Sequence, residues 1–484
     1  CSRRFQLSPA AIVVVSLALL QGTMPSSAIA QAGESGPVYK AAPCCSLCPR
    51  AADPSVYVSR FMRDHRITIQ GTGDWLFRTE VDLDTEFAVD EAVYADLSRM
   101  VRELNARGTQ ILLLDLPRRG LLAADKLLPA NRERYDRKTT LTNYRRMLQR
   151  FRDIGFIVPD YGLLAEQPDG AGYFFHRDGH WTPDGARRTA RLIADAVMAQ
   201  PFYGGLRRKA FKTRQVGQQR HPGVLSIVAS QICGGNFPSE VVSGFVTSPS
   251  ETFPFADEPV PDVTLVGTSF SALPAYHFAG FLQQDLQTDV YNASLSGGNF
   301  DGAMTQYLPS AAFQENPPKL LIWEFAHPQI AAATTTQLRR LIPLVENGCI
   351  GQEPLLKNEV PVTSGGDFTE VLFNGGGAII SAKSRELVVD LQFADPGIGE
   401  ILSEIWYLDG KHEVVRVRMN DYTRANGRFV LELNREPDYS EQPLIDFRVQ
   451  IVTPLSGATS VSATLCRRAE PSKTELHSRK GAAT

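Results

Sequence analysis

Helical periodicity and buried strand-like runs alternate along residues 85–348. Residues 85–107 carry apolar side chains at helical spacing, and Gly108 follows as a stop signal. The next segment, Gln110–Leu116, is a short run that is apolar on both faces, which is typical of a strand buried in a parallel sheet. Further helices are expected at 141–151 and 183–198, and further buried strands at 156–159, 263–267 and 319–325. Strands that alternate with helices predict an open parallel sheet in a three-layer α/β domain.

The pattern changes near Gly348 to short β-type runs separated by turn signals, and it keeps this character as far as Cys466. The turn signals are rich in Gly and Asn: Asn374–Gly377, Asp409–Gly410 and Asn426–Gly427. A segment of about 110 residues with this pattern is typical of a β-sandwich. From Arg467 onwards the chain is polar and unpatterned, which predicts a disordered tail.

The first thirty residues have the order of a secretory signal peptide. Arg3 and Arg4 provide a basic start, Ala10–Leu20 is a continuous apolar run, and Ala28–Ala30 offers an A-x-A cleavage site. The apolar run is shorter than the roughly 20 residues that cross a bilayer, which disfavours the alternative of an N-terminal membrane anchor. The expected divisions are therefore a signal peptide at 1–30, an α/β domain at 31–348, a β-sandwich at 349–466 and the tail at 467–484.

Composition and charge limit the possible partners. A length of 484 residues suits two domains, and 43% hydrophobic with 21% charged residues is the composition of an ordinary globular protein. Without residues 1–30 the formal net charge goes from −3 to −5, because Arg3 and Arg4 are removed and no acidic residue is. Nothing in this balance indicates binding to nucleic acid.

Six cysteines remain after residue 30, and an even number in an exported chain favours disulfides. The expected pairs are Cys349 with Cys466, which would tie together the ends of the β-sandwich, and Cys233 with one of Cys44, Cys45 and Cys48. The alternative is a metal site at the 44–48 cluster. A structural zinc site normally has four ligands, however, and the chain has no second CxxC pair, so we expect no metal and no cofactor.

Candidate catalytic chemistry comes from two short segments. Ser269 follows a buried strand, and Gly267 allows the chain to turn sharply there. A serine hydroxyl needs a base to become a nucleophile, and a carboxylate should orient that base. The D-x-H pair formed by Asp178 and His180 supplies both, because alternate residues of an extended loop point to the same side. We predict that Asp178 holds His180 and that the second ring nitrogen faces Ser269.

Neither segment is specific by itself. A Gly-Thr-Ser turn after a strand is usually only a turn, and D-x-H pairs are common. The spacing His176-x-Asp178-x-His180 also suits a zinc or iron site. Ser269 favours the serine enzyme, because a metal hydrolase would not need it.

Three motifs together make the interpretation more specific: Gly73–Phe77 (GDWLF), Asp178–Thr182 (DGHWT) and Leu320–Phe325 (LLIWEF). They resemble the SGNH-hydrolase-like domain of the alginate O-acetyltransferase family that includes AlgX and AlgJ, in which the D-x-H element precedes the serine. The trailing β-domain between paired cysteines resembles the carbohydrate-binding module that AlgX has and AlgJ lacks. The resemblance covers nearly all of residues 40–466. One departure is Thr268, which replaces the aspartate of the common GDS block.

The resemblance implies an acyl-serine mechanism on alginate or a similar acidic polysaccharide. Ser269 would attack an acetyl donor with His180 as base, and a sugar hydroxyl would then take the acetyl group. The oxyanion donors would be the Ser269 N–H together with Gly298 and Asn299, for which a structural turn is the alternative. The resemblance also implies a periplasmic location and protein partners in a polysaccharide export and acetylation complex. A polysaccharide deacetylase or esterase with the same triad, and a non-catalytic polysaccharide-binding scaffold, stay open as alternatives.

Sugar contacts are expected from arginines, because a polyuronate carries carboxylates that guanidinium groups bind well. Arg118 and Arg119 follow the strand that ends at Leu116, and Trp323 could serve as a sugar platform, although a tryptophan on a buried strand is more often part of the core. In the β-domain the candidates are Lys411, Arg416 and Arg418, for which ordinary solvated charge is the alternative.

Overall fold

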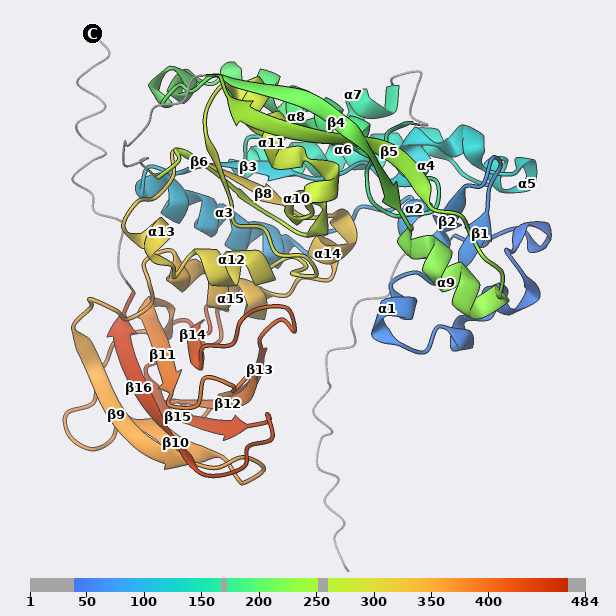
Figure 1. The fold of residues 1–484 in the computed structure, drawn as a ribbon. Helices are drawn as coiled ribbons and strands as arrows, with labels where there is room; N and C mark the ends of the chain where they lie inside the picture. The colour runs from blue at the N-terminus through green and yellow to red at the C-terminus, as the bar shows by residue number, and fades with distance from the viewer. Residues whose placement is uncertain (1–38, 167–171, 251–259, 469–484) are drawn as a thin grey trace, which may run out of the picture. The chain divides into compact units, whose positions relative to one another are not determined.

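The computed structural model describes residues 39–166, 172–250 and 260–468 (Figure 1). The predicted signal peptide at 1–30 lies outside these ranges, as does all but the start of the predicted tail at 467–484. Within the described ranges, the helices are all too short or too polar to cross a bilayer.

A four-stranded parallel sheet forms the centre of the N-terminal part, as the sequence predicts. Its strands lie in the order β3 (Gln110–Leu114), β8 (Leu320–Glu324), β6 (Val263–Val266) and β7 (Val290–Asn292). Every residue of β6 and β8 is buried, which explains why their sequences, VTLV and LLIWE, are largely apolar. The expected strand at 156–159 forms only a single bridge to β3, because Pro159 has no N–H with which to continue a ladder.

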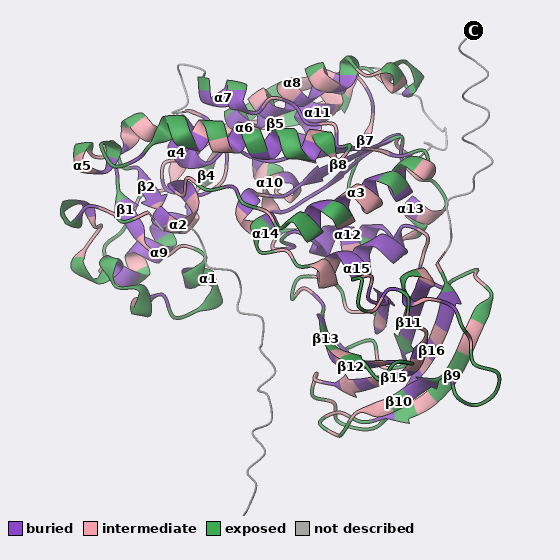
Figure 2. Ribbon diagram, turned by 180° about the vertical axis from the view of Figure 1, so that it is seen from behind, coloured by how far each residue is buried: buried purple, intermediate pink, exposed green. Residues whose placement is uncertain are grey.

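Helices cover both faces of this sheet (Figure 1). On one side lie α3 (Glu91–Ala106), α12 (Gly302–Tyr307) and α15 (Thr335–Leu344), and on the other lie α8 (Pro183–Met198) and α11 (Phe278–Leu286). The capping residue Thr182 accepts a hydrogen bond from the Gly185 N–H, with Pro183 in the first turn, so α8 begins where the sequence predicts. The amphipathic helix α6 (Arg137–Asp153) turns its polar side to solvent, as Figure 2 shows.

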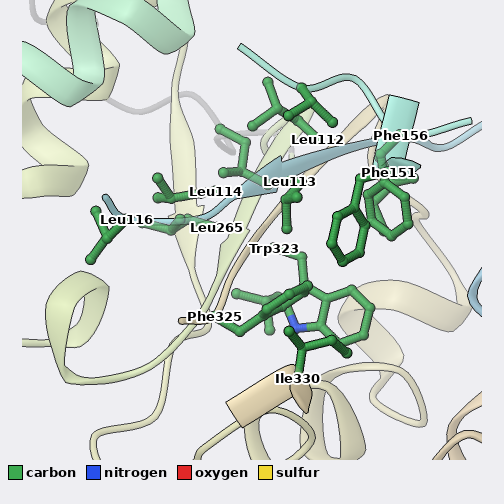
Figure 3. Close-up of a cluster of buried hydrophobic side chains, with 14 of the residues drawn as sticks. Leu112, Leu113, Leu114, Leu116, Phe151, Phe156, Leu265, Trp323, Phe325 and Ile330 are labelled. Carbon is green, nitrogen blue, oxygen red and sulfur yellow. The ribbon is translucent and has the colours of Figure 1, made fainter. Parts of the chain in front are cut away.

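Trp323 belongs to the hydrophobic core between the sheet and its helices. Its side chain is 1% exposed, and its ring packs against those of Phe300 and Phe325, with ring centroids 4.9 and 5.0 Å away. Figure 3 shows it among the leucines of β3 and the rings of Phe151 and Phe156. The prediction that Trp323 is a sugar platform is therefore wrong, because a sugar ring has no access to a fully buried indole.

A segment that the sequence analysis did not recognise connects α8 to β6. It consists of a strand β4 (Phe211–His221), a helix α9 (Val224–Cys233) and a strand β5 (Glu240–Pro249) that pairs antiparallel with β4. The disulfide Cys48–Cys233 joins the end of α9 to the N-terminal region, while Cys44 and Cys45 are free. We refer to residues 211–249 as the β4–α9–β5 segment.

The C-terminal part is all-β, as predicted, and contains two four-stranded antiparallel sheets around one hydrophobic core. One sheet has the order β10 (Thr369–Phe373), β15 (Leu444–Ile451), β12 (Glu400–Tyr407) and β13 (His412–Arg418). The other has the order β14 (Arg428–Glu432), β11 (Leu387–Phe393), β16 (Thr459–Arg467) and β9 (Pro354–Val362). The strict in–out alternation of burial along β12 is that of a sandwich strand. The disulfide Cys349–Cys466 is the expected bridge across this domain.

Candidate active site

Ser269, His180 and Asp178 form a hydrogen-bonded chain. Ser269 begins the short helix α10 (Ser269–Ala272) at the carboxyl end of β6, where an open α/β sheet places its ligands. Its Oγ lies 2.7 Å from Nε2 of His180, and Nδ1 of His180 lies 2.6 Å from Oδ1 of Asp178. A carboxylate only accepts hydrogen bonds, so Nδ1–H donates to Asp178 and leaves Nε2 free to accept the serine proton. The two segments that the sequence predicted as partners are thus in contact.

The loop that carries the D-x-H pair is a tight turn between two bridged residues. Phe174 and Trp181 form an antiparallel bridge, so the intervening residues fold back on themselves. The Trp181 indole N–H donates to the Phe270 carbonyl at 3.1 Å, which ties this loop to the turn that carries the serine. The rings of Phe270 and Tyr276 flank His180, with ring centroids 4.6 and 5.3 Å away.

Asp178 is completely buried, yet four hydrogen bonds keep it ionised. One oxygen accepts from the ring and the backbone N–H of His180, and the other accepts from His221 Nε2 at 2.7 Å and from the Val224 N–H at 2.9 Å. Burial opposes ionisation, but the hydrogen bonds from His180 and His221 outweigh it and hold the pKa of Asp178 well below its usual value. The carboxylate therefore stays available to stabilise a protonated His180.

A buried glutamate fixes the turn beneath Ser269. The Thr268 N–H and hydroxyl donate to the Glu324 carboxyl at 2.6 and 2.9 Å, and burial raises the pKa of that carboxyl. Gly267 is required here, because a Cβ at this position would lie 2.5 Å from a Glu324 oxygen. Thr268, which departs from the GDS block, thus has a structural partner in the last residue of β8.

Arg119 binds the backbone of the D-x-H loop rather than a substrate. Its side chain is 1% exposed, and it donates to the carbonyls of Phe175 and Asp178 at 2.6 Å each and to that of Leu76 at 2.7 Å. Arg118 is also buried and donates to the Glu86 carbonyl at 2.7 Å and to His327 Nδ1 at 2.6 Å. The prediction that these two arginines contact sugar carboxylates is corrected accordingly, because protein groups occupy both guanidinium groups.

Replacing Arg119 with leucine is expected to lower the free energy of unfolding by about 3–5 kcal/mol, because three buried backbone carbonyls lose their hydrogen-bond donor and the buried Asp82 carboxylate loses one of its two cationic partners. Urea unfolding of the full chain measures this change. The exposed Arg146 on α6 provides the matched control, since Arg146→Leu should change stability by no more than about 0.5 kcal/mol. Equal unfolding midpoints for the two variants would contradict the role of Arg119.

His176 does not join the other two members of the H-x-D-x-H spacing. Its ring stacks on Trp75, with centroids 4.9 Å apart, whereas both Asp178 oxygens are engaged by histidines 180 and 221 and by backbone N–H groups. Among the residues that the structure describes, no three His, Cys, Asp or Glu side chains are grouped as metal ligands.

The two predicted oxyanion residues, Gly298 and Asn299, lie in a turn with other contacts. The Gly298 N–H donates to the Leu295 carbonyl at 2.9 Å, so it is not available to an oxyanion, and the structural alternative holds for this residue. Asn299 has a positive φ of 51° and lines a groove with Arg60 and Asp301. In contrast, the Ser269 N–H has no acceptor among the described residues.

The basic residues of the β-domain fall into two places. Arg416 and Arg418 are exposed on β13 and line the same groove of about 780 Å³ as Asn299. Each already faces a carboxylate, Glu400 for Arg416 and Asp421 for Arg418. Lys411 lies outside that groove and donates to the Asp438 carbonyl at 3.0 Å.

The groups of the β4–α9–β5 segment that hold the D-x-H loop were not predicted from the sequence. His221 and the Val224 N–H bind Asp178, and the Glu240 carboxylate accepts from the backbone N–H groups of His176 and Arg177, both at 2.9 Å. The chain contains only eight histidines, so a histidine followed by Pro-Gly and an apolar helical run was a usable signal.

Comparison with known proteins places this architecture in a family. A family model described as "SGNH hydrolase-like domain, acetyltransferase AlgX" matches residues 68–327, and a C-terminal carbohydrate-binding module matches residues 348–478. The alginate biosynthesis protein AlgX of Pseudomonas putida is 37% identical over 89% of this chain and 91% of its own length. The probable alginate O-acetylase AlgJ of the same organism is 30% identical over 53% of this chain and 68% of its own length.

A solved structure agrees with this result. That of Pseudomonas aeruginosa AlgX has a TM-score of 0.79 and 33% identity, and the match covers 88% of this chain and all of that one. The match includes both the α/β and the all-β part, which a relative of AlgJ type would not provide over this length. This chain therefore belongs to the AlgX family of alginate biosynthesis proteins, with an SGNH hydrolase-like domain followed by a carbohydrate-binding module.

Proposed function

We propose that this chain transfers acetyl groups to hydroxyls of alginate through an acetyl-Ser269 intermediate. The observation that carries the proposal is the 2.7 Å hydrogen bond between Ser269 Oγ and His180 Nε2, supported on the far side of the ring by the ionised Asp178. Family membership supports alginate as the polymer, since the relatives of similar length are alginate biosynthesis proteins.

In the first step Ser269 Oγ attacks the carbonyl carbon of an acetyl donor while His180 takes the hydroxyl proton. The charge that develops on the carbonyl oxygen is met by the free Ser269 N–H. Collapse of this intermediate breaks the bond to the leaving group, which departs with the proton from His180. Asp178 stabilises the imidazolium that exists between these two events.

In the second step a sugar hydroxyl gives its proton to His180 and attacks the acetyl carbon. The new ester bond forms, the bond to Ser269 Oγ breaks, and the proton returns to the serine. Water in place of the sugar would give acetate, so hydrolysis is the competing outcome at this step. The rings of Phe270 and Tyr276 cover two sides of His180 and restrict its exposure, which disfavours water.

The C-terminal module would hold the polymer near this site. Carbohydrate-binding modules keep a polysaccharide close to an enzyme, and the groove lined by Arg416 and Arg418 offers guanidinium groups to uronate carboxylates. We also propose that the reaction takes place in the periplasm, as the signal-peptide pattern of residues 1–30 indicates, and that other proteins of the export and acetylation machinery are among the partners.

An acetyl-transfer assay tests the function. The full chain is incubated with an activated acetyl ester and oligomannuronate, and the oligomers are analysed by mass spectrometry for added acetyl groups. We expect acetylated oligomers from the uronate and none from a neutral oligosaccharide of the same length. Release of acetate without acetylated sugar would contradict transfer and favour the esterase alternative.

A further inference from the structure

One half of the Asp178 carboxylate is held from outside the D-x-H loop. Oδ1 accepts from His180, whereas Oδ2 accepts from His221 Nε2 at 2.7 Å and from the Val224 N–H at 2.9 Å. Two histidines therefore share one buried carboxylate, one on each oxygen. The chemistry described above uses only the first of them.

The orientation of the His221 ring is well defined. It stacks on Phe175, with centroids 4.0 Å apart and an angle of 19° between the rings, and its edge meets Tyr276. Because the carboxylate only accepts, His221 carries its proton on Nε2. The titratable groups that face this ring are Asp178 and the Tyr276 phenol, and Glu240 is its partner across the β4–β5 ladder.

The backbone around His221 holds the same loop at further points. Glu240 accepts from the His176 and Arg177 N–H groups, and the Leu225 N–H donates to the Arg177 carbonyl at 3.0 Å. Gly223 is in the left-handed region at φ 75°. A Cβ at this position would lie 2.6 Å from the Arg177 carbonyl oxygen, so only glycine allows the backbone at residue 223 to approach the D-x-H loop this closely. The disulfide Cys48–Cys233 fixes the far end of α9.

We propose that His221 is a positioning residue of the acetyl-transfer site, which acts on His180 through Asp178. Its Nε2–H holds the second carboxylate oxygen, so that the first stays aligned on Nδ1 of His180. It also withdraws part of the negative charge from the side that faces His180. During transfer His180 takes the proton of Ser269, passes it to the leaving group, takes the proton of the sugar hydroxyl and returns it to Ser269, while Asp178 stays ionised and keeps its hydrogen bond from His221. This inference rests on the proposed function of the triad.

Two substitutions separate the hydrogen bond from the packing of the ring. His221→Leu removes the donor, and His221→Gln keeps a neutral N–H donor that does not titrate. Hydrolysis of an activated aryl acetate by the full chain, followed from about pH 5 to pH 9, gives kcat/KM and the midpoint of its acid limb.

We expect His221→Leu to lower kcat/KM about 10- to 100-fold, the size of a lost hydrogen bond to a charged group. The midpoint of the acid limb should also move to higher pH. Without the donor, more negative charge remains beside His180, which stabilises its protonated form. His221→Gln should stay within about threefold of the unsubstituted chain and keep its midpoint. The exposed Gln218 on the same strand provides the control, since Gln218→Leu should change neither quantity.

Full activity and an unchanged midpoint in His221→Leu would overturn the inference. Equal losses in His221→Leu and His221→Gln, with no movement of the midpoint, would also overturn it, because a purely structural role gives that result. The failure of the proposed function looks different: there, turnover by the unsubstituted chain would not depend on Ser269.

Discussion

Replacing Ser269 with alanine is expected to lower turnover of an acetyl ester by about 10³-fold or more, because neither His180 nor Asp178 can replace the serine hydroxyl in forming the acyl intermediate. The residual rate would come from the free N–H at position 269 and from substrate binding. Ser269 is only partly buried and its hydroxyl bonds to His180, so the free energy of unfolding should change little. The rate at which the alcohol is released from an activated acetyl ester measures the effect.

Ser271 is a suitable control for this experiment, since it lies on the same short helix and faces the Glu324 carboxyl rather than His180. We expect Ser271→Ala to retain activity within about tenfold of the unsubstituted chain, because it removes only a neutral hydroxyl outside the proton path. Equal ester turnover by Ser269→Ala and by the unsubstituted chain would overturn the assignment of Ser269 as the nucleophile. A covalent adduct of a serine-directed probe on residue 269 is a second, independent measurement.

The contact among Asp178, His180 and Ser269 could be predicted because the three residues lie in two short segments with local patterns. A serine directly after a buried parallel strand lies at the carboxyl ends of the strands, where ligands bind in open α/β sheets. The D-x-H spacing puts a base and its carboxylate on one side of a loop. The all-β domain could also be predicted from the sequence, because turn signals and alternating apolar positions are local features. The parallel sheet followed from strands that are apolar on both faces, such as β6 and β8.

Other features depend on contacts that no local pattern carries. Arg119 looks like a surface arginine after a strand, and only the fold shows that carbonyls from two distant segments surround it. His221 reaches Asp178 across 43 positions of the chain, through a segment whose helix and strands had no strong periodicity. The choice of Cys48 over Cys44 and Cys45 as the partner of Cys233 is also a matter of where α9 ends.

The second large effect is expected for Asp178→Asn, which should lower turnover about 10³- to 10⁴-fold although the side chain keeps its size. Asparagine offers one accepting oxygen where the carboxylate offers two. With the amide oxygen toward His180, the NH₂ group of the asparagine faces the Val224 N–H, and two hydrogen-bond donors then meet because a backbone N–H cannot accept. With the NH₂ group toward His180, the ring must accept on Nδ1 and carry its proton on Nε2, so it can no longer accept from Ser269.

Either orientation leaves buried donors facing each other, so this variant should also lose about 1–3 kcal/mol of unfolding free energy, unlike Ser269→Ala. The combination of both losses distinguishes the buried acid from the nucleophile in a paired measurement of ester turnover and urea unfolding. Asp184, an exposed aspartate in the first turn of α8, supplies the matched control, and Asp184→Asn should have little effect on either. Activity of Asp178→Asn within tenfold of the unsubstituted chain would show that His180 does not need this carboxylate. The four hydrogen bonds on Asp178 would then serve only to hold the loop.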